Sequence, residues 1–299
     1  SHTDARYNGM AMNCFTQKGD KVMIQPPVYH PFAWVTTRNE RTLVINPLRW
    51  ENGMYRMDLD AFREQIKGCK LFILCNPHNP GGVVWTEAEL RAIADICYDE
   101  KVLVFSDEIH ADLTLPPHTH RPFATVSEKA RMNSVTFMSP SKAFNMPGLS
   151  ASHALIFNED LRKRFRIYMD AGELDMGHVF AFLSVEAAYS HGTEWLDQCL
   201  AYIQGNIDFV DEFLKKHAPK IKAIRPEASY LVWLDCRELE LSQKDLNEFF
   251  VDKAHLALND GEMFGKEGIG FMRLNVASPR CIIEKAMKQL ADAYQLYIK

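Results

Sequence analysis

Short apolar runs alternate with segments of helical periodicity along the first half of the chain. Two runs, residues 70–75 and 102–105, have no polar alternation, which is typical of strands buried on both faces. Helical segments follow at 58–67 and at 86–100, the second opening with the capping residue Thr86. The strand candidates in chain order are residues 21–25, 43–45, 70–75, 102–105 and 135–138. This alternation predicts an α/β fold with a three-layer, mostly parallel sheet.

The second half of the chain contains longer helical segments and fewer strands. Residues 194–216 resemble one long helix, and the strand candidates 228–235 and 271–276 follow it. We therefore predict three parts. They are residues 1–18, polar at first and then the end of a helix; residues 19–190, the large domain; and residues 191–299, a smaller C-terminal α/β domain with its connecting helix.

Composition narrows the class of protein. The chain has 299 residues, 47% hydrophobic and 24% charged, which is ordinary for a globular protein. Its net charge of −5 argues against a nucleic-acid surface and leaves small-molecule substrates open. The seven cysteines include no Cys-x-x-Cys pair, which fits a reducing cytoplasm better than a zinc cluster or disulfides. No membrane span and no signal peptide are visible.

Three irregular stretches directly follow strand candidates, where ligands bind in open α/β sheets. Asn79 lies in a turn rich in proline and glycine, and Asp107 ends a buried run. Lys142 follows the run 135–138 between Pro140 and Pro147, so we expect it on an irregular connection and not on a solvated helix. An amine among apolar neighbours loses hydration, which favours an imine with an aldehyde such as pyridoxal phosphate.

Asp107 has alternative interpretations. A buried carboxylate needs a cationic partner, and a protonated pyridine nitrogen is one. The carboxylate could also cap a helix, or join Glu108 and His110 in a metal site. Adjacent side chains of an extended segment point in opposite directions, which argues against the metal.

The sequence resembles the fold-type I pyridoxal-phosphate enzymes of the class I/II aminotransferase family. It is most similar to the cystathionine β-lyase (C–S lyase) branch, the MalY/PatB type. Nearly the whole chain takes part in the resemblance. The strings that carry it are residues 25–32, 76–82, 106–110, 139–145 and 270–275.

The resemblance implies a role for each candidate residue. Lys142 would bind the cofactor covalently and move the α-proton of the substrate. Arg273 would bind the substrate carboxylate, for which a planar two-pronged donor is well suited. Asp107 would pair with the ring nitrogen of the cofactor, and Asn79, with His110 less firmly, would contact its phenolic oxygen. Tyr29 would stack on the face of the ring. Ser139 and Ser141 would bind the phosphate.

Two features depart from the family pattern. Ser150 stands where the family's aminotransferases commonly have an arginine that binds the phosphate. Family members also carry a further N-terminal segment, with a helix N-terminus that cradles the phosphate. We therefore expect this chain to fold but to bind the cofactor weakly, and to turn over slowly or not at all.

Residue chemistry alone leaves the reaction open, because a β-lyase and an aminotransferase use the same side chains. The branch-like strings and Ser150 favour a C–S β-lyase that converts cystathionine or cysteine-type amino acids to a thiol, pyruvate and ammonia. The alternatives are an aminotransferase and a non-catalytic or regulatory protein that binds the cofactor. The resemblance also implies a homodimer.

Overall fold

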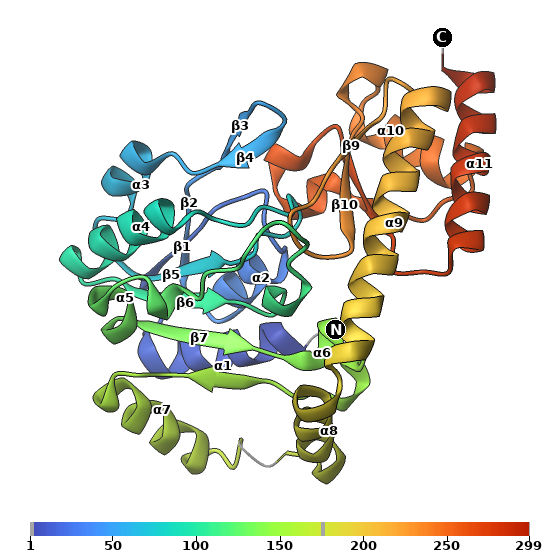
Figure 1. Ribbon diagram of the computed structural model, residues 1–299. Helices are drawn as coiled ribbons and strands as arrows, with labels where there is room; N and C mark the ends of the chain where they lie inside the picture. Colours follow the sequence, from blue (N-terminus) through green and yellow to red (C-terminus); the bar gives the residue numbers. More distant parts are fainter. Residues whose placement is uncertain (1–2, 175–176, 299) are drawn as a thin grey trace.

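The computed structural model describes residues 3–174 and 177–298, and its largest sheet has six strands. The strand order is β2-β1-β5-β6-β7-β8; neighbours pair in parallel except β8, which is antiparallel to β7 (Figure 1). The strands are β1 (Lys21–Ile24), β2 (Thr42–Ile45), β5 (Cys69–Cys75), β6 (Leu103–Asp107), β7 (Ser134–Met138) and β8 (His153–Leu155).

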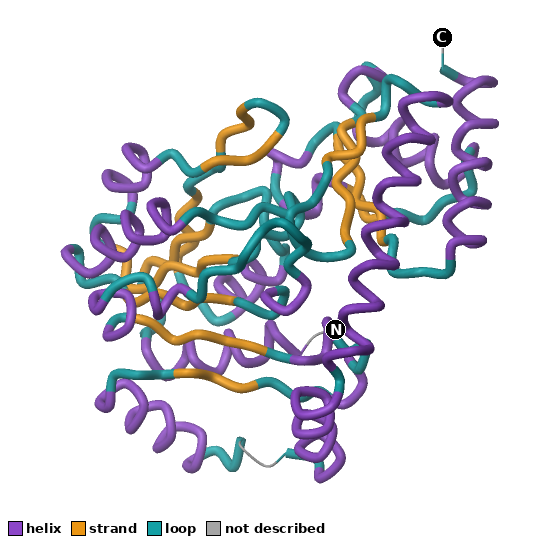
Figure 2. The backbone as a smooth tube through the Cα atoms, in the orientation of Figure 1, coloured by secondary structure: helices purple, strands orange, loops and turns teal. Residues whose placement is uncertain are grey.

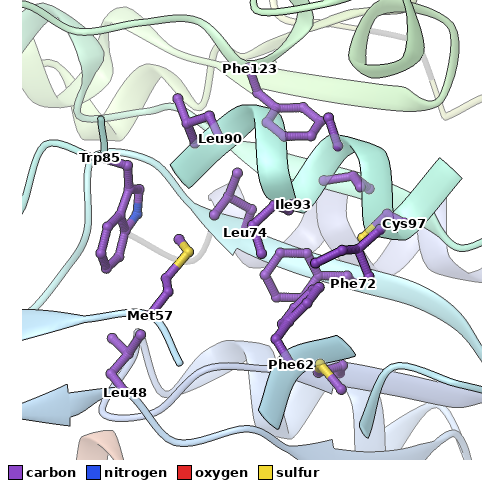
Figure 3. Close-up of a cluster of buried hydrophobic side chains, with 14 of the residues drawn as sticks. Leu48, Met57, Phe62, Phe72, Leu74, Trp85, Leu90, Ile93, Cys97 and Phe123 are labelled. Carbon is purple, nitrogen blue, oxygen red and sulfur yellow. The ribbon is translucent and has the colours of Figure 1, made fainter. Parts of the chain in front are cut away.

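Helices cover both faces of this sheet, as Figure 2 shows. They are α1 (Thr3–Phe15), α2 (Pro31–Arg38), α3 (Leu59–Gln65), α4 (Glu87–Asp99), α5 (Glu128–Met132) and α7 (Glu159–Ala171). The side chains of β5 alternate between two cores. Phe72 and Leu74 pack with α3 and α4 (Figure 3), whereas Leu71 and Ile73 pack with α1, α2 and α7. The predicted three-layer arrangement is therefore confirmed.

A second, antiparallel sheet has the order β11-β12-β10-β9. Its strands are β9 (Lys222–Ile224), β10 (Leu231–Asp235), β11 (Asn259–Asp260) and β12 (Phe271–Asn275). The helices against it are α9 (Thr193–His217), α10 (Gln243–Glu248, then a π-helical turn over Phe249–Lys253) and α11 (Arg280–Tyr297). The chain divisions predicted at residues 18 and 190 stay predictions.

A small hairpin connects the two sheets. It consists of β3 (Arg49–Glu51) and β4 (Met54–Arg56), and it lies between the two sheets in Figure 1. Trp233 of β10 donates its indole N–H to the hydroxyl of Tyr55 at 3.1 Å, and its ring stacks on Phe271. Trp233 and Tyr55 are both buried, so this contact fixes the second sheet against the hairpin.

Several local expectations were wrong. Within residues 1–18 the sequence predicts only the end of a helix, yet α1 already begins at Thr3. Lys142 lies on a short helix, α6 (Pro140–Ala143), and not on an irregular connection, because Ser139 caps the helix and Pro140 fits its first turn. The remaining α-helix of the described residues is α8 (Val179–His191). Among the described residues, no helix is both long and apolar enough to cross a bilayer.

Candidate active site

Three of the predicted site residues follow neighbouring parallel strands at the same edge of the large sheet. Asp107 is the last residue of β6, Asn79 follows β5, and Lys142 follows β7 on α6 (Figure 1). The carboxyl ends of parallel strands meet at one edge, where an open α/β sheet places its ligands. The fold therefore brings these three side chains to a common site.

Asp107 is almost completely buried, and its carboxylate is held from α1. The side-chain amide of Asn8 donates an N–H to Asp107 Oδ2 at 3.0 Å, and Asn8 is itself fully buried. A buried carboxylate is costly unless donors or cations face it. The backbone N–H of Ile109 also donates to Asp107 Oδ1, at 3.5 Å, and a cation beside this buried carboxylate would stabilise it further.

Glu108 points away from Asp107, as the alternation of an extended segment requires. Its carboxylate accepts from the hydroxyl of Ser106 at 2.7 Å and from the backbone N–H of Phe123 at 2.8 Å, and it lies 2.7 Å from His120 Nε2. Across the described residues, no cluster of three or more histidine, cysteine, aspartate or glutamate side chains could hold a metal ion. The two adjacent carboxylates therefore serve separate environments.

His110 is a buried, neutral histidine between two cations. Burial, with smaller effects from the charges of Lys142 and Arg273, lowers the pKa of His110 to about 3. Its ring centroid lies 6.3 Å from that of Tyr230. At neutral pH the imidazole can therefore donate or accept a hydrogen bond without adding charge.

Arg273 comes from the second sheet and reaches the loop after β5. Its Nη1 donates to Asn79 Oδ1 and its Nη2 to Asn259 Oδ1, both at 2.8 Å. The guanidinium also lies 4.6 Å from the ring centre of Phe264. Burial lowers the pKa of Arg273 to about 10, so the side chain is a cation at neutral pH. Arg273 and Asn79, 194 residues apart, therefore meet directly.

Lys142 is half-buried, and its charge acts on His110. Ser139 and Ser141, the predicted phosphate ligands, are both buried, with their hydroxyls 2.8 Å apart. Ser139 Oγ also accepts from the backbone N–H of Ser141 and lies 2.5 Å from the carbonyl oxygen of Ala151.

The predicted ring-stacking residue and the departure at residue 150 both lie near this region. Tyr29 packs edge-on against Phe32, with centroids 5.5 Å apart, and its phenol acts electrostatically on Arg273. Ser150 is exposed and has a left-handed backbone, with φ of 52°. Its short, exposed side chain supplies no cation where aminotransferases of the resembled family carry one.

Sequence reasoning missed three residues that the fold adds to this site: Asn8, Asn259 and Tyr230. Asn8 is 99 residues from Asp107, and no local spacing connects them. Tyr230 directly precedes β10, whose partner β12 carries Arg273. A pairing of those two strands would have indicated Tyr230, and only the tertiary fold indicates Asn8.

The comparisons with known proteins agree with this geometry. A sequence profile described as aminotransferase class I and II matches residues 5–290. The chain belongs to this family. It is 38% identical over 286 residues to cystathionine β-lyase PatB of Bacillus subtilis, covering 95% of this chain and 74% of that protein. It is 31% identical over 282 residues to the protein MalY of Escherichia coli, covering 93% and 72%.

Solved structures of the family have the same fold. The crystal structure of cystalysin from Treponema denticola, which contains a pyridoxal 5'-phosphate cofactor, superposes with a TM-score of 0.95 at 34% identity. The match covers 99% of this chain and 75% of that one. The resemblance inferred from the sequence strings and the predicted fold class are therefore both confirmed.

The residues present fit a polar ligand with an anionic and a basic end. The ring atom Nδ1 of His110 and Nε of Arg273 are buried and have no hydrogen-bond partner within the described ranges. Buried polar atoms normally have partners, so these two are available to a ligand. Together with the carboxylate of Asp107 and the amine of Lys142, they match the chemical groups of pyridoxal phosphate and an amino acid.

Proposed function

We propose that this chain is a pyridoxal-phosphate-dependent C–S β-lyase. The observation that carries the proposal is that Lys142 and Arg273 both act electrostatically on His110, which follows Asp107 by three residues, in a chain related to PatB, a cystathionine β-lyase. Its substrates are cystathionine or other cysteine-type amino acids. The reaction is R–S–CH2–CH(NH3+)–COO− + H2O → R–SH + pyruvate + NH4+.

When bound, pyridoxal phosphate supplies an aldehyde that captures the substrate amine and a protonated ring that accepts electrons released at the α-carbon. Asp107 would hold the proton on the ring nitrogen, because its buried carboxylate, which accepts from the side-chain amide of Asn8, is stabilised by an opposing positive charge. Asn79 and His110 would hydrogen-bond the phenolic oxygen of the ring, and Tyr29 would stack on its face. Ser139 and Ser141 would bind the phosphate.

Two cationic side chains act on the substrate. Lys142 would hold the cofactor, and its amine would take the proton from the substrate α-carbon. Arg273 binds the substrate carboxylate with its fork of N–H donors. Asn79 and Asn259 fix two of these nitrogens at 2.8 Å, so the guanidinium plane is oriented before the substrate arrives.

Elimination is favoured over transamination by the relatives and by one side chain. PatB and a cystathionine β-lyase of Corynebacterium glutamicum, at 38% and 30% identity, are C–S lyases by name, whereas the aspartate aminotransferases match at 22–24%. Ser150 agrees with this, because an exposed serine supplies no positive charge for the phosphate.

The test is an assay of the cofactor-loaded chain with L-cystathionine and with L-cysteine. We expect a thiol and pyruvate in equal amounts, and no turnover from Lys142→Ala. The control Lys163→Ala removes an exposed lysine of α7 and should retain activity. A keto acid that retains the substrate's side chain would favour the aminotransferase. Cofactor binding without any product would favour the non-catalytic alternative.

We also propose that the enzyme is a homodimer in which α8 is covered by a second copy. Four large apolar side chains of this helix, Val179, Phe180, Phe182 and Leu183, are 56–62% exposed. Apolar patches of this kind mark association surfaces. Sedimentation should give twice the chain mass, and the double substitution Phe180→Asp and Leu183→Asp should give the monomer. A wild-type monomer at micromolar concentration would contradict the dimer.

We propose that the enzyme is cytoplasmic, because its cysteines are reduced. All seven are free thiols, and five of them are buried. Reduced thiols persist in the cytosol. Fractionation of the producing cell tests this, and recovery of the protein outside the cytosol would contradict it.

A further inference from the structure

The segment that leads into β10, residues 226–229, links the second sheet to two loops of the first. It makes hydrogen bonds to the loop after β5 and to the loop after β6. Those loops carry Asn79 and His110, whereas β10 pairs with β12, which carries Arg273. The segment therefore connects the elements that hold all three of these site residues.

Glu227 makes the contact with the loop after β5. Its Oε2 accepts the backbone N–H of Val84 at 2.8 Å, and its own backbone N–H donates to the carbonyl oxygen of Gly82 at 2.8 Å. The side chain of Glu227 is only 15% exposed. A hydrogen bond to a carboxylate that is sheltered from water is stronger than one between neutral groups. Glu227 thus fastens the loop both through its backbone and through its side chain.

The loop packs so closely on this segment that residue 82 has to be glycine. Gly82 has a φ of +70°, and a Cβ there would lie 2.5 Å from Cβ and 2.8 Å from Cα of Pro226. The loop therefore has no room to move toward the segment, and the hydrogen bonds of Glu227 oppose a move away from it.

Asn79 belongs to a closed turn that these contacts hold. The backbone N–H of His78 donates to the carbonyl oxygen of Val83, and that of Gly82 donates to the carbonyl oxygen of His78, both at 2.8 Å. Asn79 lies within this turn, and its Oδ1 accepts from Nη1 of Arg273 at 2.8 Å. A displacement of the turn at Gly82 would therefore displace the amide that orients the guanidinium.

The segment is also fixed on its other side, where one residue is strained. The backbone N–H of Leu115 donates to the carbonyl oxygen of Glu227 at 2.9 Å, and that of Ser229 donates to the carbonyl oxygen of Leu113 at 2.8 Å. Ser229 is 4% exposed and has a φ of 80°, which residues other than glycine rarely adopt. Such a backbone persists only where its surroundings over-determine it. The segment is therefore a rigid support for the loop after β5.

We propose that Glu227 is a positioning residue for substrate binding: it fixes the turn that holds Asn79, and through Asn79 it orients Arg273 toward the substrate carboxylate. The inference rests on the proposed lyase function, which assigns that carboxylate to Arg273. Glu227 acts only through these hydrogen bonds. Its loss should weaken binding of the ground state and the transition state alike, which raises KM and leaves kcat unchanged.

The first test is steady-state kinetics of the cofactor-loaded full chain with L-cystathionine. We expect Glu227→Ala to raise KM about tenfold, with kcat within about twofold. Glu227→Gln retains an oxygen that accepts the N–H of Val84 and should restore most of the loss. Glu227→Asp keeps the charge but shortens the reach. It should raise KM by a smaller factor, and it replaces the alanine variant if that chain does not fold.

The matched control is Glu89→Ala. Glu89 also accepts a backbone N–H at 2.8 Å, that of Thr86, but it does so at the start of α4. This variant loses the same kind of hydrogen bond and should leave KM unchanged.

A double-mutant cycle separates positioning from a general loss of structure. In the background of Asn79→Ala, the further change Glu227→Ala should raise KM by less than about twofold, because the connection to Arg273 is already broken. Effects of the two substitutions on KM that simply multiply would overturn the inference.

Hydrogen exchange of the cofactor-free full chain supplies a readout independent of turnover. Glu227→Ala should speed exchange of the amides of residues 78–84 about tenfold, while those of β5 keep the rate of the unaltered chain. Equal acceleration in both regions, or an unchanged KM, would overturn the inference while the lyase function stands. Absence of pyruvate from the unaltered chain would instead refute the lyase function, and the substrate-binding role of Glu227 with it.

Discussion

The side chains on the two sides of Lys142 differ in how deeply they are buried and in how far away in the sequence their hydrogen-bond partners lie. On the sheet side, Asn79, Asp107 and His110 are buried, and the first two make hydrogen bonds to residues 194 and 99 positions away in the sequence. On the side of α9, Trp195 and Tyr202 are half exposed, and with Lys142 they line a cavity of about 430 Å³. Long-range contacts hold the first region rigid, whereas the second can change its rings without disturbing the core.

This difference predicts where substitutions have the largest effects. Charged groups must be fixed in a region of low dielectric, where each is expensive to misplace. We therefore expect substitutions on the sheet side to affect cofactor and turnover for every substrate. Substitutions of the half-exposed rings on the α9 side should have smaller effects.

Asp107→Asn should have the largest effect of the substitutions that keep Lys142. It removes the negative charge that we propose lies opposite the ring nitrogen, and a charge-assisted hydrogen bond of about 3 kcal/mol corresponds to about a hundredfold in rate. We expect a loss of about that size in kcat for all substrates, with weaker cofactor binding by equilibrium titration. The matched control Glu108→Gln changes the adjacent carboxylate, which faces His120, and should lower stability more than cofactor affinity. An equal loss of cofactor affinity in Asp107→Asn and Glu108→Gln would contradict separate roles for the two carboxylates.

Arg273→Lys should follow, with an effect on substrate more than on cofactor. Lysine keeps the charge but loses the fork that contacts Asn79 and Asn259. We expect KM to rise about thirtyfold for both L-cysteine and L-cystathionine, with cofactor affinity within about twofold. Steady-state kinetics with the two substrates measure this. A rise in KM confined to one substrate would indicate that Arg273 contacts the variable end of the substrate and not its carboxylate.

Asn8→Leu should have a smaller effect on the same side. It keeps the volume but removes the N–H donated to Asp107 at 3.0 Å. We expect the dissociation constant of the cofactor to rise about tenfold, from the loss of one hydrogen bond to a charged group. Asn46→Leu is the control, since Asn46 is equally buried but bonds Gln25 and Gln65. An unchanged cofactor affinity in Asn8→Leu would show that α1 does not support Asp107.

His78→Gln should leave turnover nearly unchanged and alter the pH dependence of stability. Burial lowers the pKa of His78 from its ordinary 6.5 to about 4. Between those values the unfolded chain binds a proton that the folded chain does not, so stability falls as pH falls, by about 1.4 kcal/mol per pH unit. Urea unfolding of the cofactor-free chain from pH 7 to 5 should give a shallower slope for the variant. An identical slope would contradict a buried neutral His78.

Local patterns predicted most of the first sheet, because its strands are continuous apolar runs and its helices carry visible caps. The capping box of Thr86 and Glu89 forms as expected. The β3–β4 hairpin escaped prediction because its three-residue strands are too short for a periodic pattern, and Tyr55 is buried by residues distant in sequence, among them Trp233 and His78. The helical turn at Lys142 was missed because four residues are too few for a periodic pattern.

The site was only partly predictable. Asn79, Asp107 and Lys142 were found because each follows a strand, and Arg273 came from the family resemblance. Asn8 could not be found, because an asparagine on a helix is unremarkable until the fold places it against a buried carboxylate. The hydrogen bond between Glu227 and Val84 likewise joins residues 143 positions apart, which no local pattern encodes.

The most direct measurement of the central claim is a map of the covalent attachment. The cofactor-loaded chain is reduced with borohydride, digested, and its peptides are analysed by mass spectrometry. The result predicted is a single modified peptide with the pyridoxyl group on Lys142, absent from Lys142→Ala. Modification of another lysine, or none at all, would contradict the claim that this amine at the end of β7 carries the cofactor.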